Sequence, residues 1–288
     1  MSRPPTLRLP STARPGRLAT ERGEFAVLWS EERPDAEPRY GTALLVPGFT
    51  GSKEDFLPLL EPLARAGFRV CAVDGRGQYQ SAGPREESAY AQEELVRDVL
   101  AQTRALGGTA HLLGHSFGGQ VCRAAVLADP EPFASLTLLS SGPGAVHADQ
   151  RARLEVLGPA LRQLPMEKIW QMISQMDPPE APGQETPAEV REFLRDRWLG
   201  TEPAQLLAAG AQLLVEPDRS EELSASGVPV HVVSGERDYA WPVESLADMA
   251  KRLDAPHTVI EGAEHSPNVE RPEVTAEALA DFWRRHAG

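Results

Sequence analysis

HLLGHSFGGQVCRAAVLA, residues 111–128, changes from one kind of pattern to another in its middle. An apolar run ends at Gly114, and an apolar pattern with helical spacing begins after Gly118, so the order is strand, abrupt turn, helix. The turn has the form G-x-S-x-G, in which the central serine sits on a strained bend that lifts its hydroxyl clear of the backbone. Side chains in place of the two glycines would collide with the neighbouring strand and helix. The spacing therefore predicts an available hydroxyl on Ser116 at the end of a strand.

This turn resembles the nucleophile elbow of the α/β-hydrolase superfamily, in which a serine, an acid and a histidine follow one another along the chain. Two later segments match that order. Gly235 stands three residues before Asp238, after one apolar strand pattern, and Gly262 stands three before His265, after the next. The resemblance implies a catalytic triad of Ser116, Asp238 and His265, in which the histidine takes the serine proton and the acid orients the imidazole.

A second loop of the same superfamily is matched by TALLVPGFTGS, residues 42–52. Its apolar strand pattern ends at Pro47-Gly48, where the superfamily usually has its first oxyanion loop, written His-Gly-x. By resemblance, the backbone N–H groups of Phe49 and Phe117 would donate to the oxyanion. Pro47 replaces the usual histidine. This replacement should not affect stabilisation of the oxyanion, because backbone N–H groups provide it.

Strand and helix patterns alternate along the chain, which is typical of an α/β protein. The resemblance implies an α/β-hydrolase fold, a mostly parallel central sheet flanked by helices. Residues 143–226 show helical patterns alone and are too many for a single crossover, so we expect them to form an inserted helical cap, or lid. The α/β core would then comprise residues 23–142 and 227–288. Residues 1–22, rich in arginine and proline, are expected to form a mobile tail.

The expected cap carries an apolar helix face in MEKIWQMISQM, residues 166–176. Trp170, Met172 and Met176 belong to this face and could line a substrate pocket beneath the cap. Packing of the cap onto the core explains the same residues equally well. Both interpretations stay open at the level of the sequence.

Other side chains capable of chemistry are expected to be structural. His111 and His231 lie inside strand patterns, and His115 occupies the variable position of the elbow. Cys71 and Cys122 have no Cys or His at metal-ligand spacing, so buried reduced thiols are expected. The sequence has no metal-binding motif and no G-x-G-x-x-G after a strand, so neither a metal nor a nucleotide cofactor is predicted.

Composition and charge limit the partners. With 41% hydrophobic and 25% charged residues, the 288-residue chain has the composition of an ordinary globular protein. Its 29 Lys+Arg against 42 Asp+Glu give a net charge of −13, which would repel phosphate backbones, so no nucleic acid partner is expected. No apolar run reaches the roughly 18 residues of a membrane span, and no signal segment opens the chain, so we expect a cytoplasmic location.

These features predict a serine hydrolase that cleaves a carboxylic ester with a small or medium acyl group through an acyl-enzyme. Enzymatic alternatives are a carbon–carbon bond hydrolase of the meta-cleavage type, a thioesterase and a haloperoxidase-like perhydrolase, because fold and triad do not define the leaving group. A ligand-binding module on the same fold is the non-enzymatic alternative. The natural substrate and the oligomeric state are not specified by the sequence.

Overall fold

One sheet organises the molecule. The computed structural model describes residues 1–31, 39–176 and 186–287, and within them eight strands form a single sheet in the order β1-β2-β4-β3-β5-β6-β7-β8. The strands from β4 to β8 in that order pair in parallel, whereas β1 and β2 are antiparallel. The mostly parallel central sheet predicted from the sequence is therefore confirmed. The strands are β1 (Ala13–Thr20), β2 (Gly23–Ser30), β3 (Thr42–Val46), β4 (Arg69–Val73), β5 (Ala110–His115), β6 (Phe133–Leu139), β7 (Val230–Gly235) and β8 (His257–Ile260).

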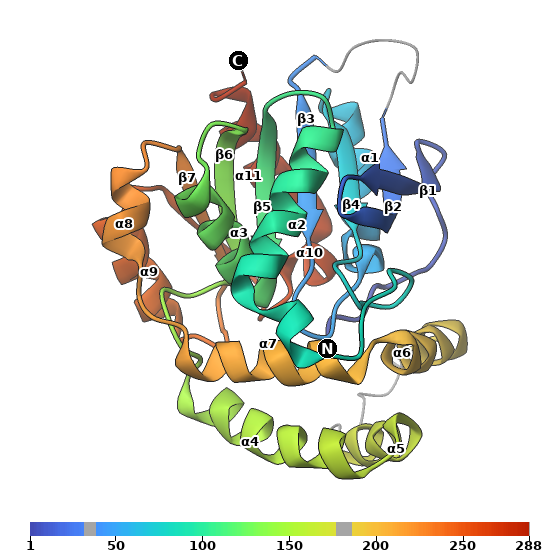
Figure 1. Cartoon of the computed structure of the whole chain (residues 1–288). Helices are drawn as coiled ribbons and strands as arrows, with labels where there is room; N and C mark the ends of the chain where they lie inside the picture. Colours follow the sequence, from blue (N-terminus) through green and yellow to red (C-terminus); the bar gives the residue numbers. More distant parts are fainter. Residues whose placement is uncertain (32–38, 177–185, 288) are drawn as a thin grey trace.

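Helices cover both faces of the sheet, with α2 and α3 on one side and α1, α10 and α11 on the other (Figure 1). The elements that follow the strands are η1 (Lys53–Phe56), α1 (Leu57–Arg65), η2 (Glu87–Tyr90), α2 (Gln92–Ala105), α3 (Phe117–Ala128), α9 (Val243–Arg252), α10 (Pro267–Glu270) and α11 (Pro272–Arg284). Among the helices of the described ranges, none has the length and apolar character needed to cross a bilayer.

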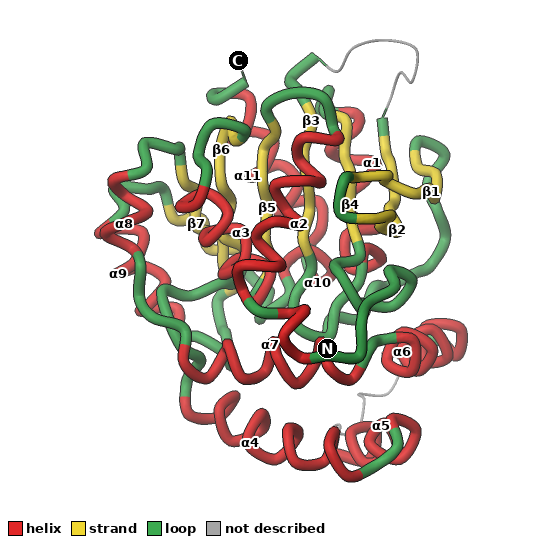
Figure 2. Tube along the Cα trace, in the orientation of Figure 1, coloured by secondary structure: helices red, strands yellow, loops and turns green. Residues whose placement is uncertain are grey.

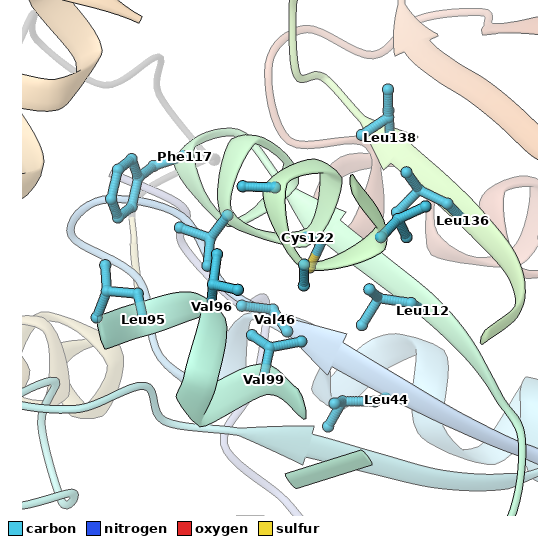
Figure 3. Packing of buried hydrophobic residues seen from close by; sticks show 14 of the residues in the cluster. Leu44, Val46, Leu95, Val96, Val99, Leu112, Phe117, Cys122, Leu136 and Leu138 are labelled. Carbon is cyan, nitrogen blue, oxygen red and sulfur yellow. The ribbon is translucent and has the colours of Figure 1, made fainter. Parts of the chain in front are cut away.

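The strands are apolar on both faces because both faces are covered. On β3, Leu44 and Val46 join the core beneath α2 and α3, whereas Ala43 and Leu45 join the core beneath α1 and α11. Figure 3 shows the first of these cores, where side chains from β3, α2 and α3 interdigitate. This packing holds the strand ends, and therefore the starts of the loops that follow them, in fixed positions.

Between β6 and β7 the chain forms α4 (Ala148–Gln163), α5 (Met166–Met176), α6 (Ala188–Gly200), α7 (Pro203–Val215) and α8 (Ser220–Ala225). We call α4–α7 the cap helices, because they lie together beyond one end of the sheet (Figure 2). The expected insertion, residues 143–226, also contains α8, which packs on α3 and α9 at the side of the sheet. The last helix of that segment is thus part of the core layer.

The prediction of a mobile tail over residues 1–22 is wrong. Residues 13–20 form β1, which pairs along its whole length with β2. As an edge strand, β1 buries Leu18 alone and exposes most of its polar side chains, and an edge also tolerates Pro15. The prediction failed because the arginines and prolines of residues 1–22 give this edge strand a composition like that of a disordered tail.

Two buried histidines make the fold sensitive to acid. His111 and His231 lie on β5 and β7, and burial lowers the pKa of each from 6.5 to about 4. Unfolding returns each imidazole to water, so the unfolded state binds more protons than the folded state between these two pH values. We expect the contribution of each of these histidines to the free energy of unfolding to be fully retained above pH 6.5 and to fall by about 3 kcal/mol as the pH drops toward 4.

Urea denaturation at a series of pH values measures this loss. His231→Gln is the informative variant, because glutamine can still bond to Thr258 Oγ1, which lies 2.8 Å from His231 Nε2, yet does not titrate. Its free energy of unfolding should decline less steeply with acid than that of the natural chain. If the free energy of unfolding declined equally steeply in the variant and in the natural chain, His231 would not be a source of the acid sensitivity.

Candidate active site

Ser116 sits on the sharp bend between β5 and α3. Its backbone has φ 54° and ψ −121°, a strained conformation for a residue other than glycine. A Cβ on Gly114 would lie 2.4 Å from the carbonyl oxygen of Gly118, and a Cβ on Gly118 would lie 2.4 Å from that of Pro47. Both positions therefore require glycine, because the backbone of a neighbouring segment lies too close for a side chain. This is the steric reason expected from the sequence.

His265, in the loop after β8, connects the serine to the acid. Its Nε2 lies 3.1 Å from Ser116 Oγ, and its Nδ1 lies 2.8 Å from Asp238 Oδ2. Asp238 Oδ1 accepts the backbone N–H groups of Ala240 at 2.7 Å and Trp241 at 3.0 Å. The structure thus brings together the three side chains singled out in the sequence, and both carboxylate oxygens of the acid have donors.

His115 supports the loop of His265. Its ring is fully buried and its Nε2 lies 2.9 Å from the carbonyl oxygen of His265, to which it donates. Burial and, to a smaller extent, the neighbouring His265 lower the pKa of His115 to about 3. A structural role is the one expected for His115 from the sequence, and the structure shows its form: the neutral imidazole holds the backbone of His265 in place.

The predicted oxyanion loop passes directly beside the serine. A Cβ on Gly48 would lie 3.2 Å from Ser116 Cβ, so the N–H of Phe49 follows the point of closest approach. Phe117 opens α3, and the first N–H groups of a helix have no acceptor within it. Gln78 supports this loop, because its Nε2 donates to the carbonyl oxygen of Gly48 at 2.8 Å. The sequence alone did not single out Gln78.

Asp74, the acid directly after β4, belongs to a separate buried cluster. Its carboxylate lies 2.9 Å from Lys53 Nζ and accepts the Lys53 N–H at 2.8 Å. Burial raises the pKa of Asp74 to about 6, and the Lys53 ammonium opposes that rise. These contacts tie Asp74 to the start of η1 and give it a structural role.

A cavity of about 330 Å³ lies between α4 and α7. Phe49, which follows the oxyanion-loop glycine, contributes to its wall, whereas Ser116 and His265 do not. Its lining residues are Phe49, Leu154, Glu155, Leu157, Gly158, Pro159, Leu161, Arg162, Gln163, Leu206, Leu207, Gly210, Ala211 and Leu214. A mostly apolar wall of this kind suits a hydrocarbon group.

The residues predicted to line the pocket lie elsewhere on the cap helices. Trp170 packs between the cluster of α6, formed by Val190, Phe193 and Leu194, and a second cluster within the cap. Met172 is 41% exposed, and the side chain of Met176 lies outside the described residues. The apolar face of α5 packs on α4 and α6. Neither Trp170 nor Met172 lines this cavity.

Comparisons with known proteins agree with this architecture. The chain is 31% identical over 229 residues to a pimeloyl-[acyl-carrier protein] methyl ester esterase of Aeromonas hydrophila, covering 77% of this chain and 87% of the relative. It is 27% identical to a 2-(acetamidomethylene)succinate hydrolase of Mesorhizobium japonicum, over 82% of this chain and 85% of that one. A thermophilic esterase from Thermogutta terrifontis superimposes with a TM-score of 0.75 at 23% identity, over 96% of this chain and 100% of the other.

A family model covers most of the sequence. It is described as the alpha/beta hydrolase family and matches residues 43–278, a range that includes the elbow, the loop of Asp238 and the loop of His265. The chain belongs to the alpha/beta hydrolase family.

Proposed function

We propose that the protein is a serine hydrolase that cleaves a carboxylic ester with a small or medium acyl group. The observation that carries the proposal is the continuous line of hydrogen bonds from Ser116 Oγ through the two ring nitrogens of His265 to Asp238 Oδ2. A serine hydroxyl is a weak nucleophile until a base takes its proton, and His265 Nε2 is placed to do so. Asp238 then holds the tautomer with the proton on Nδ1 and stabilises the imidazolium.

The remaining steps follow from the backbone around the serine. Attack of Ser116 Oγ on the ester carbonyl forms a tetrahedral intermediate, whose oxyanion would accept the N–H groups of Phe49 and Phe117. Each such donor typically lowers the barrier by ~3 kcal/mol. The imidazolium of His265 gives its proton to the departing alcohol. The acyl group then remains bound to Ser116 as an acyl-enzyme. Water, activated by the same imidazole, releases the acid and restores the serine.

The cavity between α4 and α7 supports the choice of acyl group. An apolar cavity of roughly 150 Å³ can hold a benzene molecule, so a cavity of about 330 Å³ has room for an acyl chain of medium length. We propose that the cap helices cover the site and that this cavity receives the acyl chain. Relatives named esterase and hydrolase support ester cleavage over the binding-module alternative.

A fluorophosphonate probe tests the nucleophile. The proposal expects one covalent adduct per chain, on Ser116, and no adduct on Ser116→Ala. Turnover of p-nitrophenyl esters from acetate to laurate, beside matched thioesters and amides, identifies the acyl group and the bond cleaved. A folded protein that resists the probe and turns over none of these substrates would support the ligand-binding module instead. Preference for thioesters would support the thioesterase alternative.

Filling the cavity should change the preferred chain length. Gly158 lies on α4 in the cavity wall, and a Cβ there would meet no atom within 4 Å, so the position has open space for a side chain. Gly158→Leu should lower kcat/KM for the octanoate ester about tenfold and leave the acetate ester nearly unchanged. The reason is that about two methylene groups lose their burial, each worth about 0.8 kcal/mol.

Val156→Leu is the matched control. Val156 lies on the same helix, is 67% exposed and is absent from the cavity wall. The control should leave the chain-length profile as it is. An unchanged profile in Gly158→Leu would place the acyl chain elsewhere, while the labelling of Ser116 would still test the chemistry separately.

A further inference from the structure

The first residues of the chain lie at the junction between the cap helices and the core, beside α7 (Figure 1). Ser2 makes contacts to both sides. Its Oγ lies 2.9 Å from the Oγ of Ser266, the residue that follows His265. Its carbonyl oxygen accepts a hydrogen bond from Nη2 of Arg197 on α6 at 3.0 Å. Ser2 thus connects a cap helix to the loop that carries the imidazole.

Arg197 extends this connection to the oxyanion loop. The guanidinium is almost fully buried, and its Nη1 lies 2.6 Å from Oδ1 of Asp55, which is also buried. The second carboxylate oxygen of Asp55 accepts the backbone N–H of Ser52, in the loop that contains Phe49. The carbonyl oxygen of Asp55 accepts from Asn268 Nδ2 at 2.7 Å, on α10 after His265. One buried network therefore joins α6 to both loops beside Ser116.

Apolar contacts fix the segment on either side of Ser2. The Met1 side chain packs on the cap cluster of Leu161, Ile169, Trp198 and Leu206, to which Phe49 also belongs. Leu7 packs on the α6 cluster and also on the core beneath α1 and α11. Residues 1–7 are therefore held by the cap and by the core at the same time.

We propose that residues 1–7, the amino-terminal clamp, hold the cap helix α6 against the loops of His265 and Phe49, with Ser2 as a positioning residue. This inference rests on the proposed function for its kinetic readout. Loss of the Ser2 carbonyl leaves a buried N–H of Arg197 without its acceptor, which favours entry of water and a displaced α6. Loss of the Ser2 hydroxyl loosens the turn that begins at Ser266, and with it the imidazole. The clamp thus couples cap closure to the geometry of the site.

Single substitutions separate positioning from general stability. Ser2→Ala should lower kcat for the acetate ester about threefold, the loss expected from one hydrogen bond, with KM almost unchanged. Thr6→Ala is the matched control, because Thr6 Oγ1 accepts only an exposed local bond from the Arg8 N–H among the contacts described for its side chain. The control should retain full kcat. Equal kcat in Ser2→Ala and the natural chain would contradict the role of Ser2.

Deletion of the clamp and a disulfide that locks it test whether the clamp promotes turnover or obstructs it. Deletion of residues 2–7 should lower kcat at least fivefold and speed hydrogen exchange in α6 and in residues 262–271. The double variant Ser2→Cys, Ser266→Cys should form a disulfide, because the two hydroxyls lie 2.9 Å apart. Both native cysteines are buried and would not interfere. The oxidised form should match or exceed the kcat of the reduced form.

Three results would overturn the proposal. Faster turnover after the deletion, or loss of turnover on oxidation, would show that the segment obstructs the site and must leave it. Unchanged hydrogen exchange in the deletion variant would show that the segment does not hold α6. The exchange measurement needs no turnover, so it tests the clamp even if Ser116 fails to react with the fluorophosphonate.

Discussion

Ser116→Ala is expected to lower kcat for ester hydrolysis by about a millionfold, with KM nearly unchanged. The methyl group cannot form the acyl-enzyme, and the residual rate comes from the oxyanion donors and substrate binding alone. Because Ser116 and His265 act as one unit, the double variant Ser116→Ala, His265→Ala should be no slower than either single variant. Steady-state kinetics with a p-nitrophenyl ester measure all three variants.

Ser141→Ala controls for damage to the sheet end. Ser141 follows β6, is 1% exposed and has a hydroxyl without a hydrogen-bond partner in the described structure, so its removal breaks no bond. It should retain the activity of the natural chain. Substantial turnover by Ser116→Ala, in a preparation shown by mass to carry the substitution, would remove the serine from the proposed mechanism.

Asp238→Asn is expected to lower kcat by about ten-thousandfold. The N–H groups of Ala240 and Trp241 both point at Oδ1, so an asparagine would place its carbonyl there and its NH₂ toward His265 Nδ1. The imidazole would then accept at Nδ1 and carry its proton on Nε2. That tautomer cannot take the proton of Ser116, and the loss should appear in kcat.

Asp254→Asn is the matched control for the loss of a carboxylate. Asp254 is exposed and has φ 50°, a conformation that asparagine tolerates well. It should leave kcat unchanged. If Asp238→Asn kept more than a tenth of the natural kcat, the tautomer argument would be contradicted, whatever the stability of the variant.

Local patterns predicted much of the fold. Strands buried on both faces, such as β3, appear as short apolar runs, and the glycines of the elbow reveal a turn that larger residues could not form. The edge strand β1 was missed, because a strand with a single buried residue has no apolar alternation to find. The apolar face of α5 was found, but periodicity shows that a helix is amphipathic and not what covers it. The structure shows what covers this face: Trp170 packs on neighbouring cap helices.

The sequence by itself determined the α/β class and the helical segment between β6 and β7, because strand burial and helix periodicity act within a few residues. The resemblance of three short motifs to the superfamily singled out Ser116, Asp238 and His265. Only the tertiary structure decided the distances of 3.1 Å and 2.8 Å at His265, the cavity between α4 and α7, and the position of Ser2 against Ser266. Those features join residues from 27 to more than 250 positions apart, or helices that pack on each other, and no local pattern specifies which surfaces meet when the chain folds.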